Sequence, residues 1–497
     1  MGEPLILALD EGTTSTRAIL FDARGKALAE AGRPIRQAYP RDGWVEHDPE
    51  EIFAASVEVM REAVAGAGRQ MSEVAALGVT NQRETVVVWE RASGKPIHPA
   101  IVWQDRRTAQ ACERLRAGGH EDRVTDVTGL LLDPYFSGTK LAWILDHVDG
   151  ARARAAAGEL LAGTIDTWLI WRLTGGRVHA TDATNASRTL LYDIRAGAWS
   201  AEMAQMLDVP PGILPQVLDC AADYGETEPE FLGRAVPIRG LAGDQQAALM
   251  GQGCVRPGEM KATYGTGCFL LLNTGETAPR SSARLLTTVA ARVAGRTTYA
   301  LEGAIFIAGA AIDWMRGPMG VAGGPEAVEQ LARSARPGHG VVLAPAFTGL
   351  GAPWWDPDAR GAIMGLTRDS GLAEIADACF DACALQTRDL IEAMRADAPG
   401  SFHGGAELRI DGGMSKSAWF GQRLADLSGV GVARALYRET TALGAALFAG
   451  LGAGLFADMT EAARARPEAE QHAPGMDHRM REGLYARWLD AVARVRS

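Results

Sequence analysis

The chain has 497 residues, of which 47% are hydrophobic and 22% are charged, a composition typical of globular proteins and not of disordered or fibrous ones. This length exceeds what one hydrophobic core usually supports, so it excludes a lone small binding module and predicts about two or three domains. The 50 basic and 61 acidic residues give a net charge of −11 without long blocks of one sign, which disfavours nonspecific binding to nucleic acid or to an anionic membrane surface.

Six scattered cysteines form neither a dense disulfide framework nor the paired spacing of a zinc site. They predict a reduced, cytoplasmic protein. Cys379 and Cys383 would share one helix face, where their apolar neighbours favour buried packing over metal ligation. The first residues carry no basic leader, and no run reaches about 18 uncharged apolar residues, so we expect neither a targeting segment nor a membrane span.

The chain opens on the pattern strand, turn, strand, with apolar runs at 5–10 and 17–22 around a small, hydroxyl-rich turn. Further strands are predicted at 74–80 and 85–89, and helices at 49–65 and 105–117. In the last of these, Asp105 would be a first-turn acid, and Arg106 and Arg107 would lie on a solvated basic face. The alternation of elements predicts an α/β fold.

The opening pattern recurs later in the chain. Residues 260–264 and 268–272 are apolar runs that flank the turn Gly265-Thr266-Gly267, and the strand at 408–411 runs into Gly412-Gly413. This recurrence suggests a weak internal duplication.

No Walker-A loop and no G-x-G-x-x-G fingerprint occurs in the sequence, so a nucleotide would be bound in another way. The turn at 12–15 offers backbone N–H groups and three hydroxyls to phosphate oxygens, with Asp10 placed to hold Mg²⁺ and Arg17 to balance charge. A polar hairpin tip is the alternative for this turn alone. The second hairpin and the Gly-Gly turn favour phosphate binding from two lobes, as in actin-like ATPases.

Arg83 and Glu84 follow the apolar strand at 74–80, at the end where α/β sheets bind ligands. They are either a surface ion pair or the fixed donor and acceptor of a small polyol site. Trp103 and Tyr135 would wall such a site or belong to the core. Asp244 stands before a helix, as an N-cap or as the general base for a substrate hydroxyl.

Together these motifs resemble the FGGY carbohydrate kinases of the actin-like ATPase superfamily, essentially from end to end. The resemblance is carried in order by DEGTTSTR (10–17), GWVEHDP (43–49), TNQRET (80–85), IVWQDRR (101–107), DPYFSGTK (133–140), AGDQQAAL (242–249), YGTGCF (264–269), FTGLGAP (347–353), DGG (411–413) and TALGAA (441–446).

The resemblance implies two actin-like, ribonuclease H-like lobes, roughly 1–243 and 244–497, that close over a nucleotide and substrate cleft. It implies ATP-dependent phosphorylation of glycerol to sn-glycerol 3-phosphate, with Asp244 as the catalytic base and Mg²⁺ near Asp10. Glycerol would be held by Arg83, Glu84, Tyr135, Asp244 and Gln245, with Trp103 and Phe269 on its carbons. The nucleotide would contact Thr13, Thr14, Ser15, Arg17, Thr266, Gly309, Asp313, Gly413 and Ser417. We also expect a homo-oligomer, either a dimer or a tetramer.

Three of these positions depart from the family pattern. Glu11 stands where glutamine is usual, and we expect its side chain to turn away from the phosphates or to join the magnesium shell. Asp313 and Ser417 stand where better-known members carry Gln and Asn near the nucleotide. Two rival functions remain open: a kinase of another small polyol or ketose, and a non-enzymatic actin-like ATPase, which would have no use for a polyol pocket.

Overall fold

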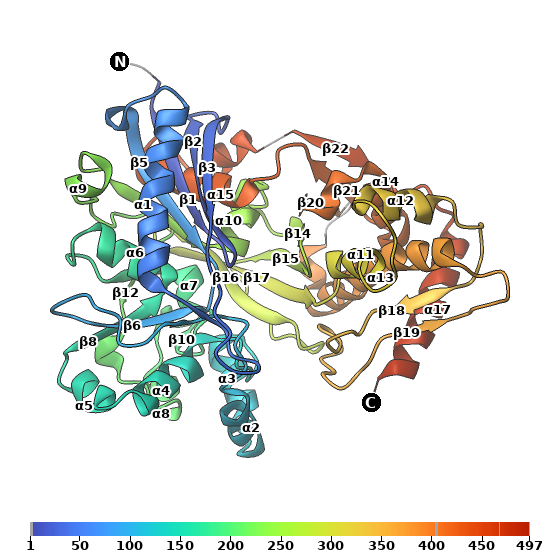
Figure 1. Cartoon of the computed structure of the whole chain (residues 1–497), viewed down its shortest axis with the longest axis horizontal. Coiled ribbons are helices and arrows are strands. Elements are labelled where there is room, and N and C mark those ends of the chain that lie inside the picture. The colour runs from blue at the N-terminus through green and yellow to red at the C-terminus, as the bar shows by residue number, and fades with distance from the viewer. Residues whose placement is uncertain (1–2, 403–405, 467, 497) are drawn as a thin grey trace.

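The structure is a computed structural model that describes residues 3–402, 406–466 and 468–496. Figure 1 shows one body around β1, β2 and β5 and a second around α13, with β16 and β17 running between them. The principal helices are α1 (Pro49–Gly66), α2 (Ala109–Ala117), α3 (Glu121–Thr128), α4 (Ser137–His147), α6 (Ile165–Leu173), α7 (Ala183–Ala186), α10 (Asp244–Gly251), α11 (Gly309–Arg316), α12 (Pro325–Arg333), α13 (Leu372–Asp397), α14 (Ala418–Ser428), α15 (Thr440–Gly452) and α17 (His478–Val495).

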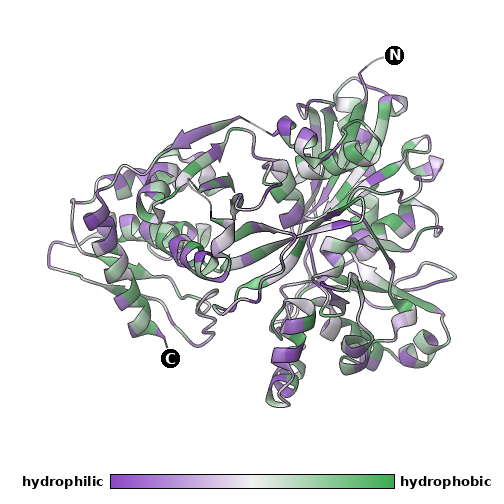
Figure 2. Cartoon of the chain, turned by 180° about the vertical axis from the view of Figure 1, so that it is seen from behind, coloured by the Kyte–Doolittle hydropathy of each residue, from purple (hydrophilic) through white to green (hydrophobic). Residues whose placement is uncertain are grey.

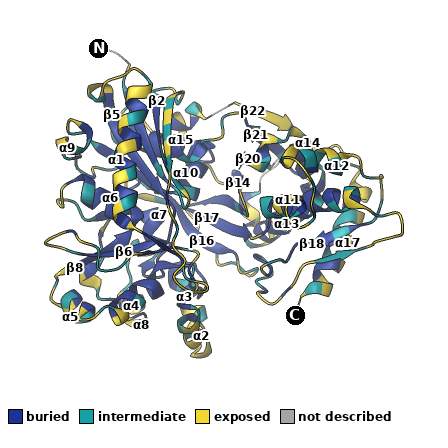
Figure 3. Ribbon diagram, in the orientation of Figure 1, coloured by how far each residue is buried: buried dark blue, intermediate teal, exposed yellow. Residues whose placement is uncertain are grey.

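The first sheet has the order β13-β5-β1-β2-β3. Its strands are β13 (Ile238–Gly243), β5 (Val74–Asn81), β1 (Leu5–Glu11), β2 (Ser15–Asp22) and β3 (Ala27–Pro34). The apolar run of β1 is buried on both faces, because Leu5, Leu7 and Leu9 pack toward α1 whereas Ile6 and Ala8 pack toward α15. Figure 3 shows these strands as buried and the outer face of α1 as exposed.

The second large sheet has the order β16-β17-β15-β14-β20-β21-β22. Its strands are β16 (Leu286–Val293), β17 (Arg296–Ile305), β15 (Cys268–Gly275), β14 (Met260–Tyr264), β20 (Glu407–Gly412), β21 (Gly431–Ala435) and β22 (Ala469–His472).

The two sheets repeat one strand arrangement. The series β3-β2-β1-β5-β13 is joined by two antiparallel and then two parallel pairings, and so is the series β17-β15-β14-β20-β21. This is the duplication that the repeated strand-turn-strand pattern suggests. Figure 2 shows apolar residues concentrated in the strands and inward helix faces of both bodies.

Helices α10 and α15, each of which follows the last strand of one of the two matching series, cross each other. Helix α10 follows β13 directly, α15 follows β21, and the two helices pack closely on each other. A Cβ added at Gly444 would lie 1.7 Å from the Ala247 carbonyl oxygen, and one added at Gly251 would lie 1.9 Å from the Thr440 carbonyl oxygen. Each helix therefore needs a glycine for the other backbone to approach this closely.

We expect Gly444→Ala to lower the free energy of unfolding by about 2–3 kcal/mol, because the new methyl group meets rigid backbone that must move. Gly483→Ala is the matched control: Gly483 lies inside α17 with open space around its Cα, so there alanine should stabilise by ~1 kcal/mol through helix propensity. Thermal or denaturant unfolding of both variants measures the difference. Equal effects would contradict the role given to the crossing.

The sequence prediction is wrong for Asp105 and Arg107. Helix α2 begins only at Ala109. The Asp105 carboxylate is buried and accepts a hydrogen bond from the Val45 backbone N–H (2.6 Å). The Arg107 side chain is buried between the rings of Trp44 and Trp143, 3.8 and 4.6 Å from their centroids. Only Arg106 is exposed, as predicted. Paired charges and cation–π contacts offset the cost of burying Arg107.

A smaller sheet lies beside the first and has the order β4-β7-β6-β8. Its strands are β4 (Glu46–His47), β7 (Ala100–Ile101), β6 (Val86–Glu90) and β8 (Leu160–Thr164). The six cysteines are all free and buried, so Cys379 and Cys383 are packing residues of α13. Within 3–402, 406–466 and 468–496, no helix has the length and hydrophobicity to cross a membrane.

Candidate active site

Arg83 and Glu84 lie just beyond the end of β5, and their side chains are only 2% and 1% exposed. The surface ion-pair alternative is therefore wrong. Glu84 has a left-handed backbone conformation (φ 65°), which is rare for a residue with a side chain, and its carbonyl accepts a hydrogen bond from the Ser137 hydroxyl (3.1 Å). Such strained backbone is held only where surrounding contacts enforce it, and it clusters at functional sites.

Two further charged residues complete this cluster. Glu302 on β17 accepts hydrogen bonds from Arg83 Nη1 (2.6 Å) and Nη2 (3.1 Å). Arg188 donates from Nε to Glu84 (2.7 Å) and from Nη2 to Glu302 (2.9 Å). Neither residue was predicted from the sequence. For Glu302 the available signal was a lone acid inside the apolar strand run at 299–305.

Asp244 is the first residue of α10, and the N-cap position belongs to Gly243. The N-cap interpretation of Asp244 is therefore wrong. Its carboxylate lies 3.1 Å from Arg83 Nε, with the side chain 33% exposed. The next residue, Gln245, is 8% exposed, and its side-chain carbonyl accepts a hydrogen bond from the buried Lys261 ammonium. Lys261 was also missed, although it stands among the few lysines of the chain and inside an apolar strand.

Two predicted aromatic residues lie together beside the first hairpin. The rings of Trp103 and Tyr135 meet edge to face, with centroids 5.5 Å apart. Both are partly buried and thus do not belong to the fully buried core. The Trp103 indole N–H donates to the Thr13 hydroxyl (2.8 Å). Phe269 lies on β15, partly buried against a small cluster that includes Leu249 of α10. Trp103 therefore joins the predicted polyol site to the predicted phosphate hairpin.

The hairpin between β1 and β2 carries the predicted phosphate contacts Thr13, Thr14 and Ser15. The turn is closed by the Gly12 N–H bonded to the Ser15 carbonyl (3.0 Å), and Thr14 is exposed at its tip. Arg17 pairs across the strands with Asp10, and its guanidinium forms an ion pair with Glu439.

The negative charge of Asp244 acts on the carboxylate of Asp10. Burial, followed by repulsion from Asp244, raises the pKa of Asp10 to about 7. Two mutually repelling, partly buried carboxylates fit a divalent cation. Mg²⁺ usually needs only one or two protein carboxylates beside water and substrate phosphates. Among the described residues, no group of three or more His, Cys, Asp or Glu forms a closed metal site.

Glu11 turns away from the hairpin, as one of the two expectations had it. Its side chain is fully buried, and one oxygen accepts a hydrogen bond from the Ser56 hydroxyl of α1 (3.3 Å). Burial, with a smaller contribution from Asp10, raises its pKa from 4.5 to about 8 against the opposing hydrogen bonds. The carboxyl is therefore largely protonated at neutral pH.

This burial predicts a pH-dependent gain for Glu11→Gln. In the unfolded chain Glu11 ionises near pH 4.5, whereas in the folded chain it keeps its proton to about pH 8, so wild-type stability falls as pH rises between these values. The neutral amide lacks this penalty. We expect the variant to gain on the order of 4 kcal/mol at pH 8 and less than about 1 kcal/mol at pH 5. Urea unfolding in metal-free buffer at both values measures it, with Glu58→Gln on the exposed face of α1 as the control. A pH-independent difference would contradict the assignment.

The second hairpin (265–267), the start of α11 and the Gly412-Gly413 turn lie next to one another. Gly309 at the start of α11 donates its N–H to the Gly265 carbonyl (3.1 Å), and the N–H groups of Ala308 and Ala310 both donate to the Thr266 carbonyl (3.0 Å). Gly412 pairs with Tyr264 across β14 and β20, and a Cβ there would lie 2.4 Å from the Tyr264 carbonyl oxygen. The structure thus brings Thr266, Gly309 and Gly413 to one edge of the second sheet.

Asp313 and Ser417 lie next to this edge. Asp313 is one helical turn beyond Gly309, exposed, and forms an ion pair with Arg316 (3.2 Å). Ser417 caps α14 by accepting a hydrogen bond from the Phe420 N–H (2.9 Å). Ser417 thus has a structural role already, whereas Asp313 has a side chain that can reach a ligand.

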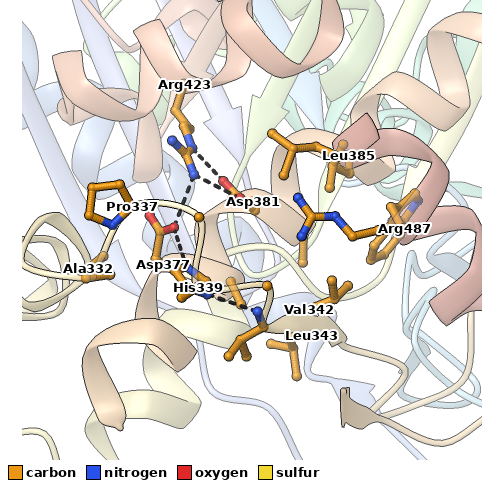
Figure 4. Close-up of a pocket in the computed structure, with 18 of the residues that line it drawn as sticks. Ala332, Pro337, His339, Val342, Leu343, Asp377, Asp381, Leu385, Arg423 and Arg487 are labelled. Carbon is orange, nitrogen blue, oxygen red and sulfur yellow. Dashed lines mark hydrogen bonds and ion pairs between the residues drawn. The ribbon is translucent and has the colours of Figure 1, made fainter. Parts of the chain in front are cut away.

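A cavity of about 450 Å³ lies elsewhere, between α13, α14, α17 and the loop at 335–343. Figure 4 shows Arg423, Asp381, Asp377 and His339 linked to one another, whereas no dashed line reaches Arg487. His339 Nε2 lies 3.0 Å from Asp377, and Arg423 contacts both Asp377 (3.1 Å) and Asp381. None of the predicted site residues lines it, so the candidate active site rests on the clusters described above.

Comparisons with known proteins agree with this geometry. Residues 5–251 match the N-terminal domain, and residues 260–453 the C-terminal domain, of the FGGY family of carbohydrate kinases. The chain is 54% identical over 492 residues to a glycerol kinase of Ectopseudomonas mendocina, covering 99% of each chain. It is 55% identical over 492 residues to a glycerol kinase of Cereibacter sphaeroides, again covering 99% of each.

Solved structures show the same fold. The crystal structure of Plasmodium falciparum glycerol kinase with ADP superposes with a TM-score of 0.92 at 32% identity, covering 99% of this chain and 98% of that one. A ligand-bound xylulose kinase from Lactobacillus acidophilus, at 21% identity and a TM-score of 0.88 over 99% and 98% of the two chains, shares the fold. With both of its domains matched in order, the chain belongs to the FGGY family of carbohydrate kinases.

Proposed function

We propose that the protein transfers the γ-phosphoryl group of ATP to a terminal hydroxyl of glycerol, giving sn-glycerol 3-phosphate. The observation that carries the proposal is that the buried pair Arg83 and Glu84 meets the partly exposed Asp244, whose carboxylate lies 3.1 Å from Arg83 Nε. Relatives more than 50% identical over the whole length are named glycerol kinase, which supports glycerol over another polyol or ketose.

In this proposal the polyol is recognised by fixed donors and acceptors on adjacent hydroxyls. Arg83 and Gln245 donate, Glu84 accepts, and the Tyr135 hydroxyl stays protonated because burial raises its pKa. Trp103 and Phe269 would cover the carbon atoms. By covering the substrate, these aromatic groups would also keep water from taking the phosphoryl group in place of glycerol.

The nucleotide phosphates would lie between the two hairpins, against Thr13, Thr14, Ser15, Arg17 and Thr266. Gly309 and Gly413 would border the adenosine, with Asp313 and Ser417 as the further candidates. Backbone N–H groups of both turns would face developing negative charge, a form of stabilisation that needs no reorganisation during transfer. A bound Mg²⁺, held by Asp10, would neutralise phosphate charge.

Asp244 would orient the attacking hydroxyl and accept its proton. Phosphoryl transfer needs little covalent chemistry from the protein, so positioning and charge stabilisation carry most of the catalysis. The carboxylate is partly exposed and adjoins Arg83, which places it beside the substrate hydroxyls in this arrangement.

A coupled ADP-release assay across glycerol, other small polyols and ketoses tests the proposal. The expected result is ADP release that depends on glycerol and exceeds that with any other acceptor. Preference for another acceptor would favour the rival polyol or ketose kinase. ADP release that is independent of every acceptor would favour a non-enzymatic actin-like ATPase.

The cytoplasmic location and the homo-oligomeric state, dimer or tetramer, remain parts of this proposal. A reduced compartment agrees with six free, buried cysteines. Light scattering coupled to size exclusion distinguishes monomer, dimer and tetramer.

A further inference from the structure

We propose that Glu302 and Arg188 are positioning residues of the polyol site, and that with Arg83 and Glu84 they form a closed ring of four buried charges that sets the substrate-binding geometry. The inference deepens the proposed function and rests on it. It assigns roles to Glu302, which contacts Arg83, and to Arg188, which contacts Glu84.

The ring alternates in sign at every step. Arg83 contacts Glu302 through both terminal nitrogens (2.6 and 3.1 Å), Glu302 contacts Arg188 (2.9 Å), and Arg188 contacts Glu84 (2.7 Å). The ring is closed by Glu84 Oε1, which lies 3.8 Å from Arg83 Nε. No side chain in the ring is more than 2% exposed. Two positive and two negative charges therefore cancel inside a site that water does not screen.

Burial makes the ring sensitive to the loss of any one member. Four ions removed from water are tolerated only when each is paired with good geometry, and removing one partner leaves an uncompensated buried charge. Without the Glu302 carboxylate, Arg83 and Arg188 would repel each other and compete for Glu84. Arg83 and Glu84, which are predicted to bind glycerol, would then both change position.

The carboxylates of Glu302 and Glu84 have different roles in the ring. Burial opposes ionisation of Glu302, but Arg188 and Arg83 outweigh it and lower its pKa to about 2. Glu302 is thus a permanent counter-ion for both arginines. The pKa of Glu84 is raised by burial in spite of the same arginines. Of its oxygens only Oε1 is hydrogen-bonded within the described part of the chain, which leaves Oε2 for a substrate hydroxyl.

The ring crosses from one family domain to the other. Arg83, Glu84 and Arg188 belong to the segment that matches the N-terminal FGGY domain, whereas Glu302 lies on β17 in the C-terminal one. Arg83 also reaches Asp244 through Nε (3.1 Å). A carboxylate from the second half of the chain therefore fixes the arginine that adjoins both the polyol and the proposed base.

Glu302→Gln is the principal test. The amide keeps the shape of the side chain but removes the charge. We expect KM for glycerol to rise about ten- to hundredfold, as for loss of a charged hydrogen bond in a desolvated site, with KM for ATP unchanged within about twofold. A purely structural role would lower the fraction of folded enzyme and therefore the maximal rate, with no selective rise in KM for glycerol.

A double-variant cycle gives the readout that a structural role cannot reproduce. If Glu302 acts through Arg83, then adding Glu302→Gln to Arg83→Ala should change KM for glycerol by less than about threefold, because the group to be positioned is already gone. Multiplication of the two single effects would overturn the inference.

Asp389→Asn is the matched control, since Asp389 is a carboxylate of the same half, 3% exposed, that accepts hydrogen bonds from Tyr485 and Trp488 (both 2.8 Å). We expect a lower melting temperature there and an unchanged KM for glycerol. If Glu302→Gln does not fold, Glu302→Asp keeps the charge but shortens the reach, and it should still raise KM for glycerol severalfold.

A wild-type KM for glycerol in whichever Glu302 variant folds, or equal rises for glycerol and ATP, would overturn the inference. Failure of the proposed function looks different, because wild-type protein would then release no glycerol-dependent ADP in the same assay.

Discussion

Asp244→Asn is expected to lower turnover at saturating glycerol and ATP by about 10²–10⁴-fold, the usual contribution of a positioned general base. The hydroxyl that attacks phosphorus must lose its proton, and an amide cannot accept it. Asp244 is the first residue of α10, and its carboxylate accepts a hydrogen bond from the Gln245 N–H (2.7 Å). The amide oxygen of asparagine can accept the same bond, so the substitution leaves the start of the helix intact. Nucleotide affinity by calorimetry should stay close to that of the wild type.

The control for this experiment is Asp48→Asn. Asp48 caps α1 by accepting a hydrogen bond from the Glu50 N–H (2.9 Å) and has no proposed part in the reaction. Its amide should leave turnover unchanged and lower stability by at most ~1 kcal/mol. Near-wild-type turnover of a folded Asp244→Asn protein would remove the base assignment.

Arg83→Ala is expected to raise KM for glycerol by roughly ten- to hundredfold and to leave KM for ATP nearly unchanged. Arg83 makes two charged hydrogen bonds to Glu302 and adjoins Asp244. A charged hydrogen bond lost in a desolvated site costs ~1.5–3 kcal/mol, and the truncation also leaves buried carboxylates partly unpaired. The melting temperature should therefore fall as well.

Arg123→Ala is the control, because it shows what the loss of an arginine outside the site does to the same measurements. Arg123 lies on the surface, 56% exposed, and pairs with Glu202, so both Michaelis constants and the melting temperature should stay close to wild type. If Arg83→Ala instead raises KM for ATP and spares glycerol, the substrate assignment of the Arg83 cluster is wrong.

Local patterns predicted much of this architecture. The apolar runs on either side of the turn at 12–15 predicted β1 and β2, and the recurrence near Gly265 anticipated the second sheet. The position of Arg83 and Glu84 after an apolar strand predicted that they lie at the ligand-binding end of the sheet, with a surface ion pair as the alternative, and their burial excludes that alternative. Their role toward a polyol came from the family resemblance and stays a prediction.

What escaped prediction depends on contacts between distant segments. Glu302 meets Arg83 across 219 positions of sequence, and no local pattern reports such a pairing. Arg107 looked solvated because its neighbours alternate as on an amphipathic helix, yet Trp44 and Trp143 enclose it. A charge inside an apolar strand, as at Lys261 and Glu302, is the signal that would have found two of the missed residues.

The crossing of α10 and α15 bears on how the chain can be divided. Helix α15 follows the last parallel strand of the second sheet, but it packs on β13, β5 and β1 of the first. One apolar cluster contains Ile6 and Ala8 of β1 together with Ala445 and Ala449 of α15. A chain split near residue 243 would therefore leave the first fragment with a bare sheet face and the second with an unpacked apolar helix. Recovery of the fold would require the fragments to reassociate, so the two sequence domains behave as halves of one cooperative folding unit.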